Sequence, residues 1–266
     1  MGYTDGTDWY GSALIRSICV ISVQKFNLMK KIIIFLLLLA SSSYAFPQSQ
    51  TSGWLATFNT FKTGKKTSIH NDIQWRSADE FQYTQTLLLR AGLNYHLNKK
   101  MTATAGYAFI HNYRSSGVAD GYVPEHRIWE QFIYSHKWNK LSIAHRFRLE
   151  QRFIGKTIVA NNELKNDGTV YANRFRYFIR NVLPLNKQAT FNKGMFAALQ
   201  NEVFLNFGNR QNLNGKTFDQ NRLYGAFGYR FSKKFDVEAG YMNQYINGRT
   251  NDVNNHIAQI ATYIRL

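Results

Sequence analysis

The chain has 266 residues, a net charge of +17 and one cysteine, and 15% of its residues are aromatic. A single cysteine excludes a disulfide-stapled fold. A charge this basic suits a nucleic-acid-binding protein. The arginines are spread through segments of alternating polarity, however, and the chain carries an export signal, so we expect no nucleic-acid partner.

The export signal lies near the start of the chain. Met29 is followed by two lysines, residues 32–39 form an unbroken apolar run, and Ser43 and Ala45 are small residues at the −3 and −1 positions of a cleavage site. These are the parts of a secretory signal peptide. The apolar run is shorter than the roughly 20 residues that a membrane-spanning helix needs.

This signal divides the chain into three parts. Residues 1–28 lack organisation and precede a better start, so we expect them to be a non-native upstream extension. Residues 29–45 are the predicted signal peptide, and residues 46–266 the mature domain. Cys19 lies in the removed part, so the mature domain is expected to have no disulfide.

After residue 46, the chain consists of segments in which apolar and polar residues alternate, as they do on a β-strand with two unlike faces. A first short strand is predicted at 53–61. Ten longer strands are predicted at 67–76, 85–97, 101–112, 125–138, 141–153, 171–185, 195–207, 222–231, 235–245 and 256–266. Their length fits a tilted crossing of a bilayer, which takes about 9–11 residues.

The segment 141–153 shows the two faces most clearly. Leu141, Phe147 and Phe153 share one face, whereas Arg146 and Arg148 lie on the other. In a membrane barrel the apolar face contacts lipid and the charged face lines the lumen. The parity of 125–138 is ambiguous, because Trp129 and Phe132 would lie on opposite faces.

The connections alternate between short and long. Short turns are predicted at 98–100, 139–140 and 232–234, and longer loops at 113–124, 155–170, 208–218 and 246–254. Outer-membrane barrels distribute their periplasmic turns and extracellular loops in this way. A soluble β-sandwich is the alternative, but it would need shorter strands and more regular turns.

We therefore predict an all-β fold, an antiparallel transmembrane β-barrel of 10–12 strands with short periplasmic turns and longer extracellular loops. The strand count stays open because 53–61 makes eleven, and the residues before it are too few for a twelfth crossing. This segment is expected to be a partial strand or plug, unless one connection is misread.

Several short motifs together resemble a family of bacterial outer-membrane barrels catalogued as domain of unknown function 2490 (DUF2490). The resemblance covers residues 54–266 and rests on the segments 87–95, 106–110, 125–131, 148–153, 201–206, 218–224, 240–245 and 255–256. It implies location in a Gram-negative envelope. It implies no activity and no catalytic residue.

The polar faces of these strands carry many arginines and fewer carboxylates. One interpretation is an anion-attracting, narrow passive conduit; the other is an arginine–carboxylate ladder that fills a narrow barrel and fixes its strands. The predicted members of this lumen charge ladder are Arg90, Glu125, His126, Arg127, Arg146, Arg148, Glu150, Arg152, Arg174, Arg176, Arg180, Glu202, Arg222, Glu238, Gln244 and His256.

An outer-membrane enzyme that modifies lipid or lipopolysaccharide is the alternative function. His126 lies between Glu125 and Arg127, but the sequence has no Gly-x-Ser-x-Gly motif and no metal-binding histidine spacing. We therefore expect no catalytic residue, metal or cofactor. The expected partners are outer-membrane lipids and, during biogenesis, periplasmic chaperones and the barrel-assembly machinery, and the mature protein is expected to be a monomer.

Overall fold

The computed structural model describes residues 48–78, 81–186 and 190–266. The predicted upstream extension and signal peptide lie outside these residues. Within them, no helix is long and apolar enough to cross a membrane.

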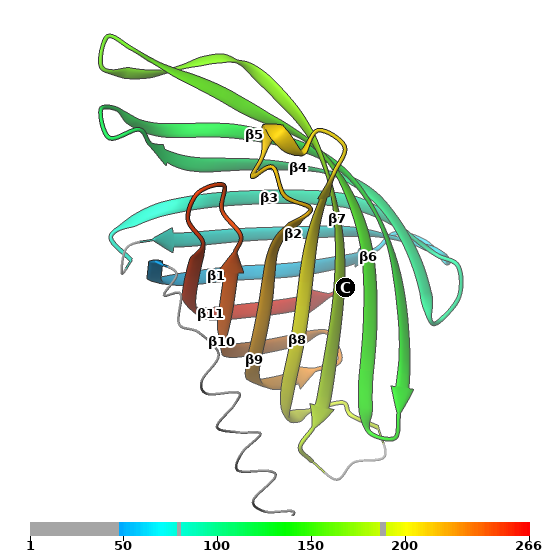
Figure 1. Ribbon diagram of the computed structural model, residues 1–266. Helices are drawn as coiled ribbons and strands as arrows, with labels where there is room; N and C mark the ends of the chain where they lie inside the picture. The colour runs from blue at the N-terminus through cyan, green and yellow to red at the C-terminus, as the bar shows by residue number, and fades with distance from the viewer. Residues whose placement is uncertain (1–47, 79–80, 187–189) are drawn as a thin grey trace, which may run out of the picture. The chain divides into compact units, whose positions relative to one another are not determined.

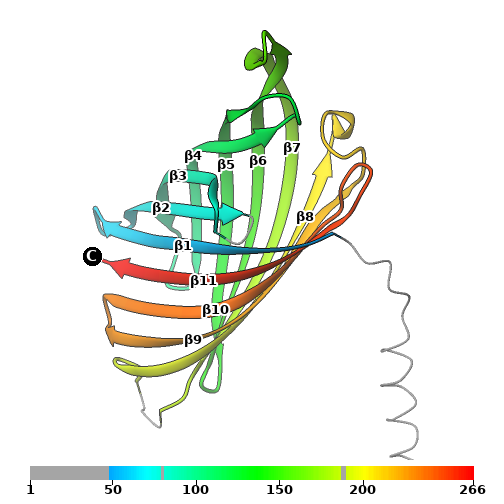
Figure 2. The ribbon, with the colours of Figure 1, turned by 90° about the vertical axis from the view of Figure 1, so that its left-hand side faces the viewer.

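Eleven strands form one closed barrel in which neighbours in sequence are neighbours in space (Figures 1 and 2). The strands are β1 (Gln48–Lys62), β2 (Thr67–Ala78), β3 (Tyr83–His96), β4 (Met101–Ser115), β5 (Asp120–Trp138), β6 (Leu141–Ala160), β7 (Glu163–Pro184), β8 (Gly194–Phe207), β9 (Phe218–Ser232), β10 (Phe235–Ile246) and β11 (Val253–Arg265). A single turn of 3₁₀-helix, η1 (Arg210–Asn212), lies between β8 and β9. The barrel prediction is confirmed, and a two-sheet sandwich is excluded.

The first strand closes the barrel. β1 pairs with β2 in antiparallel register and with β11 in parallel register, from Gln48 opposite Val253 to Thr60 opposite Arg265. With an odd number of strands that alternate in direction, the first and last must run the same way where they meet. The structure therefore has eleven strands, and the expectation of a partial strand or plug at 53–61 was wrong.

The two ends of the barrel differ in their connections. We call the end with the turns at 63–66, 97–100, 139–140 and 233–234 the short-turn end, and the opposite end the hairpin end. Two predicted loops at the hairpin end are largely strand instead. β4 and β5 continue to a turn at 116–119, and β6 and β7 to a two-residue turn at Asn161 and Asn162.

The long β6–β7 ribbon has a local cause. Asn161 and Asn162 have φ values of 55° and 58°, which is the pair of left-handed residues that a type I′ hairpin turn requires. Asparagine tolerates this conformation better than other non-glycine residues. The two strands therefore extend to their tips without a loop.

The outer face of the barrel is apolar on every strand. In a water-soluble protein, large apolar side chains on this scale are turned inward; here their outward band matches the lipid-facing surface of a membrane barrel. Large exposed side chains, one from each strand in order, are Leu55, Ile73, Leu89, Tyr107, Ile128, Leu149, Leu183, Leu199, Phe227, Tyr241 and Ile260.

Candidate functional site

The interior of the barrel receives most of the residues predicted for the charge ladder. Fourteen of the sixteen lie on inward-facing strand positions, as the alternation of burial along the strands shows. The sequence left the parity of β5 open, and there the burial pattern places Glu125 and Arg127 inward. The fourteen are Arg90, Glu125, Arg127, Arg146, Arg148, Glu150, Arg152, Arg174, Arg176, Arg180, Glu202, Arg222, Glu238 and Gln244.

The two histidines of that set, His126 and His256, lie on the outer face instead. Their side chains hydrogen-bond tyrosine hydroxyls of the neighbouring strand, His126 to Tyr107 and His256 to Tyr241, the latter with a Nδ1–hydroxyl distance of 2.6 Å. The reason is the strand alternation itself, because the residues next to each histidine point inward. The expectation that these histidines face the lumen was wrong.

An ion-pair network centred on Glu150 covers the wall formed by β5 to β8. The Glu150 carboxylate, which is 1% exposed, accepts hydrogen bonds from Arg174 Nη2 at 2.7 Å and Arg176 Nη1 at 2.6 Å. Arg176 also donates to Glu202 Oε1 at 2.7 Å, and Arg146 reaches the same oxygen at 2.8 Å. Glu150 is thus shared by two arginines of β7, and Glu202 by one arginine of β7 and one of β6.

The network continues toward the hairpin end through Glu125. This carboxylate accepts hydrogen bonds from Arg127 Nε and Arg152 Nε, both at 2.6 Å. Arg127 Nη1 lies 3.7 Å from Glu150, and Arg174 Nη1 donates to Asp219 at 3.1 Å. Charge-assisted bonds of this kind hold β5, β6, β7 and β9 together from the inside.

Other pairs lie outside this wall. Arg90 donates to Asp72 at 2.8 Å between the neighbouring strands β2 and β3. Arg180 on β7 reaches Glu238 on β10 at 2.5 Å, which brings together strands that are not neighbours in the barrel. Tyr263 donates its hydroxyl to the same carboxylate at 2.7 Å. Such a contact between distant strands narrows the lumen at this level.

Apolar residues also enter the lumen, which the sequence pattern did not predict. Trp129 is 1% exposed and packs with Leu88 and other small or apolar residues of β3 to β5. A Cβ atom at Gly92 or Gly106 would lie within 2.7 Å of the indole ring, so these glycines make the space for it. Trp129 shares its strand face with the polar residues Glu125, Arg127 and Gln131. Their positions, rather than those of the aromatic residues, indicated in the sequence that Trp129 points inward.

Two interior arginines are set apart from the paired ones. In residues 48–78, 81–186 and 190–266, neither Arg76 nor Arg222 forms an ion pair with a carboxylate. Arg76 donates to Gln74 at 2.6 Å and Arg222 to Gln220 at 3.2 Å. Both guanidinium groups lie over the ring of Trp54, with their Cζ atoms 4.0 and 5.0 Å from its centroid. The prediction included Arg222 but omitted Arg76 and Trp54.

Three cavities follow one another along the lumen. Cavity A, of about 280 Å³, includes Thr60 and Ile264 near the short-turn end. Cavity B, of about 590 Å³, is lined by residues in the middle of the barrel and in its half toward the hairpin end. Cavity C, of about 650 Å³, reaches Asn212 and Arg249 at the hairpin end.

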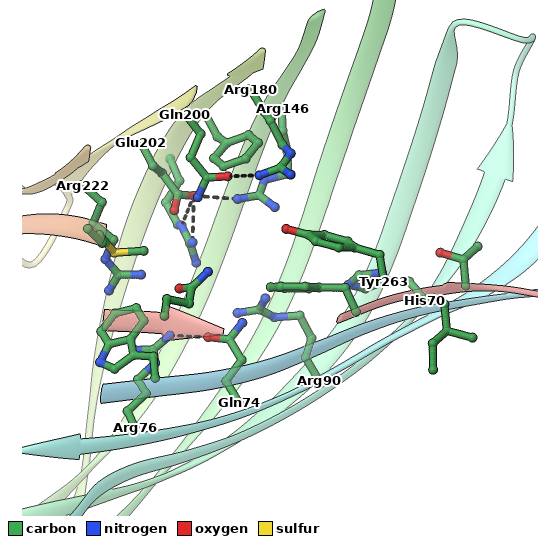
Figure 3. A pocket seen from close by; sticks show the side chains of 18 of the residues that line it. His70, Gln74, Arg76, Arg90, Arg146, Arg180, Gln200, Glu202, Arg222 and Tyr263 are labelled. Atoms are coloured by element: carbon green, nitrogen blue, oxygen red, sulfur yellow. Dashed lines mark hydrogen bonds and ion pairs between the residues drawn. The ribbon is translucent and has the colours of Figure 1, made fainter. Parts of the chain in front are cut away.

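Neighbouring cavities share lining residues, most of them arginines. Figure 3 shows five arginines of cavity A pointing into a common space: Arg76, Arg90, Arg146, Arg180 and Arg222. Cavities A and B share Arg76, Arg90, Arg176 and Arg222. Cavities B and C share Arg114, Arg152, Arg174, Gln220 and Ile246.

Comparison with known proteins adds the following. The family described as "Protein of unknown function (DUF2490)" matches residues 51–255. No curated protein matches the chain. Among solved structures, the chain is similar to one described as "NanC porin structure in rhombohedral crystal form", with 11% sequence identity over 76% of this chain and 93% of that chain and a TM-score of 0.42. A similarity this distant carries no argument about function.

Proposed function

The chain belongs to the DUF2490 family, and from that membership and the geometry of the barrel we propose that it is an outer-membrane protein that acts as a narrow, passive conduit biased toward small anions. The apolar outer face supports the membrane location. The eleven-strand count supports a narrow bore, because the diameter of a barrel grows with its number of strands.

The series of cavities is the observation that carries the proposal. Cavities A, B and C run from the short-turn end to the hairpin end, and each shares lining residues with the next. Arginines dominate the shared positions. In a lumen with low-dielectric walls, such groups raise the local concentration of anions and oppose cations.

A purely structural role is the second candidate, and the ion-pair network favours it. Arg174 and Arg176 each connect carboxylates of different strands, which is what a lattice that stiffens the wall requires. The two roles overlap, because Arg90, Arg152, Arg174 and Arg176 line the cavities and also form ion pairs. Arg76 and Arg222 line them without a carboxylate partner among the described residues. Neither proposal gives the chain a catalytic role.

Conductance in planar bilayers tests the conduit. The purified protein is expected to give small channels whose reversal potential in a potassium chloride gradient shows preference for chloride. The double variant R76Q/R222Q is expected to reduce that preference, because it removes two lumen charges that no carboxylate of the described residues pairs. K99Q is the control, since Lys99 is exposed in the turn at 97–100 and lines none of cavities A, B and C. Absence of channels from correctly folded protein would leave the structural role.

A further inference from the structure

We propose that Arg76, Arg222 and Trp54 form a binding site for a small organic anion, a carboxylate attached to an apolar or ring-shaped body. The proposal rests on the proposed function only in that the ligand enters through the lumen. It concerns equilibrium binding at one place rather than conduction along the whole barrel.

No carboxylate among the described residues forms an ion pair with Arg76 or Arg222. The Cζ atoms of Arg76 and Arg222 lie within about 9 Å of each other, because both are placed over the ring of Trp54. Among the described residues their hydrogen bonds go to amide oxygens, and the buried Nε of Arg76 has no partner. Two like charges in a confined space disfavour the folded protein unless an anion joins them.

Other arginines of cavity A, unlike Arg76 and Arg222, have carboxylate partners within the described part of the chain. Arg90 has Asp72, and Arg176 has both Glu150 and Glu202. Arg90 and Arg176 line the same cavity as Arg76 and Arg222, and the described carboxylates near them are already bound to other arginines. An exogenous carboxylate could accept hydrogen bonds from the two guanidinium groups without displacing an existing pair.

The walls of cavity A indicate the rest of the ligand. Apolar and aromatic surface is supplied by Trp54, Phe58, Phe178, Met242 and Tyr263. Amide groups that could bond neutral polar substituents are supplied by Gln74, Gln200 and Gln259.

Glu202 is the only carboxylate among the described lining residues of cavity A, and Arg146 and Arg176 already neutralise it. A bare inorganic ion would leave the aromatic surface without a partner. The volume, about 280 Å³, is just below the range of about 300–1,000 Å³ for small-molecule sites. These features favour a small organic anion over a phosphate ion or a polymer.

The position of the site gives it control over the lumen. Arg76 and Arg222 line cavity B as well as cavity A, so a ligand held by both lies at the junction of the two. In Figure 3, Arg76 and Gln74 lie at the bottom of this space and Arg222 lies at its left. Anions that pass between the cavities would therefore meet this site.

Benzoate and its neutral isostere benzamide test the proposal. Calorimetric titration of the purified protein in a zwitterionic detergent is expected to give saturable binding of benzoate and none of benzamide. R76Q and R222Q are each expected to weaken benzoate binding by about tenfold to a hundredfold, the range for a hydrogen bond to a charged group. Inorganic phosphate is the second probe, and is expected to bind more weakly than benzoate.

The control variant is R230Q. Arg230 also faces the interior but is absent from the lining of cavity A, and Asp236, its partner, retains Arg265. This variant is expected to bind benzoate as the wild type does. Thermal unfolding without ligand provides a second readout: R76Q and R222Q are expected to be at least as stable as the wild type, and benzoate to raise the unfolding temperature of the wild type alone.

Several outcomes would overturn the site. They are no benzoate binding, equal binding of benzamide, phosphate binding as tight as benzoate, or unchanged affinity in both R76Q and R222Q. Conductance separates this failure from that of the proposed function. Benzoate binding without channels removes the conduit and keeps the site, whereas anion-selective channels without benzoate binding do the reverse.

Discussion

Arg176 shows what a single side chain does in this interior. It is nearly buried and donates to two carboxylates, Glu150 and Glu202, that are themselves less than a tenth exposed. Buried charges are tolerated only when they are paired and hydrogen-bonded. Removing one member of such a group leaves the remaining charges incompletely compensated, so its loss costs more than the pair contributed.

We therefore expect R176Q to lower the free energy of unfolding by about 3 kcal/mol, at the lower end for a broken buried ion pair because Glu150 retains Arg174 and Glu202 retains Arg146. The matched control is K156Q, which removes a charge from an exposed pair and should cost less than about 1 kcal/mol. Urea unfolding of the barrel in lipid vesicles measures both. Equal losses in the two variants would contradict the assignment of Arg176 to the network.

Strand alternation predicted the interior side chains wherever both faces had distinct chemistry, as on β6 and β9. His126 and His256 were predicted in the lumen from their residue type, although the alternation places them on the outer face. The sequence did not predict which carboxylate each arginine pairs with. Arg180 and Glu238 meet although they lie on strands that are not neighbours, and this depends on barrel closure and side-chain length.

The β6–β7 ribbon is the element in which sequence and structure differ most. Residues 155–170 are polar enough to read as a loop, yet Ala160 pairs with Glu163 and the strands are continuous to the turn. The Asn161–Asn162 pair was the available signal, since two adjacent asparagines suit a type I′ turn. The polar composition of residues 155–170 made the strands hard to recognise, because a ribbon that leaves the bilayer is expected to have polar side chains on both faces.

Replacing both turn residues tests this explanation. N161A/N162A is expected to disorder the tip of the ribbon, because alanine in the left-handed region costs about 1–2 kcal/mol per residue. N162G should preserve it, since Asn-Gly is a favoured type I′ sequence. Limited proteolysis with mass spectrometry reports cleavage near residues 158–165. Equal protection of both variants would mean that the turn does not hold the ribbon.

The closure between β1 and β11 decides the architecture of the whole molecule. The sequence predicted the eleven strand-like segments but not the role of the first, because alternation says nothing about which segments pair. Parallel pairing is slightly less stable per residue than antiparallel pairing. Ala56 lies opposite Ala261 in this register, and both face the interior.

A disulfide test follows from that register. Adjacent strands lie about 4.8 Å apart, inside the range of about 4.4–6.8 Å between Cα atoms that a disulfide spans. A56C/A261C is expected to cross-link in membranes, as detected by a mobility shift that a reductant reverses. A56C/I257C, displaced by four positions along β11, should stay reduced. The opposite pattern would show a different closure.

The parallel closure also fixes where fused peptides would emerge. β1 starts beside Val253 at the hairpin end, and β11 finishes beside Thr60 at the short-turn end. An epitope placed ahead of Gln48 and one placed after Leu266 would consequently sit at opposite mouths of the barrel. Antibodies applied to intact cells should then recognise one epitope and miss the other, which gives the orientation of the protein in its envelope from a single staining experiment.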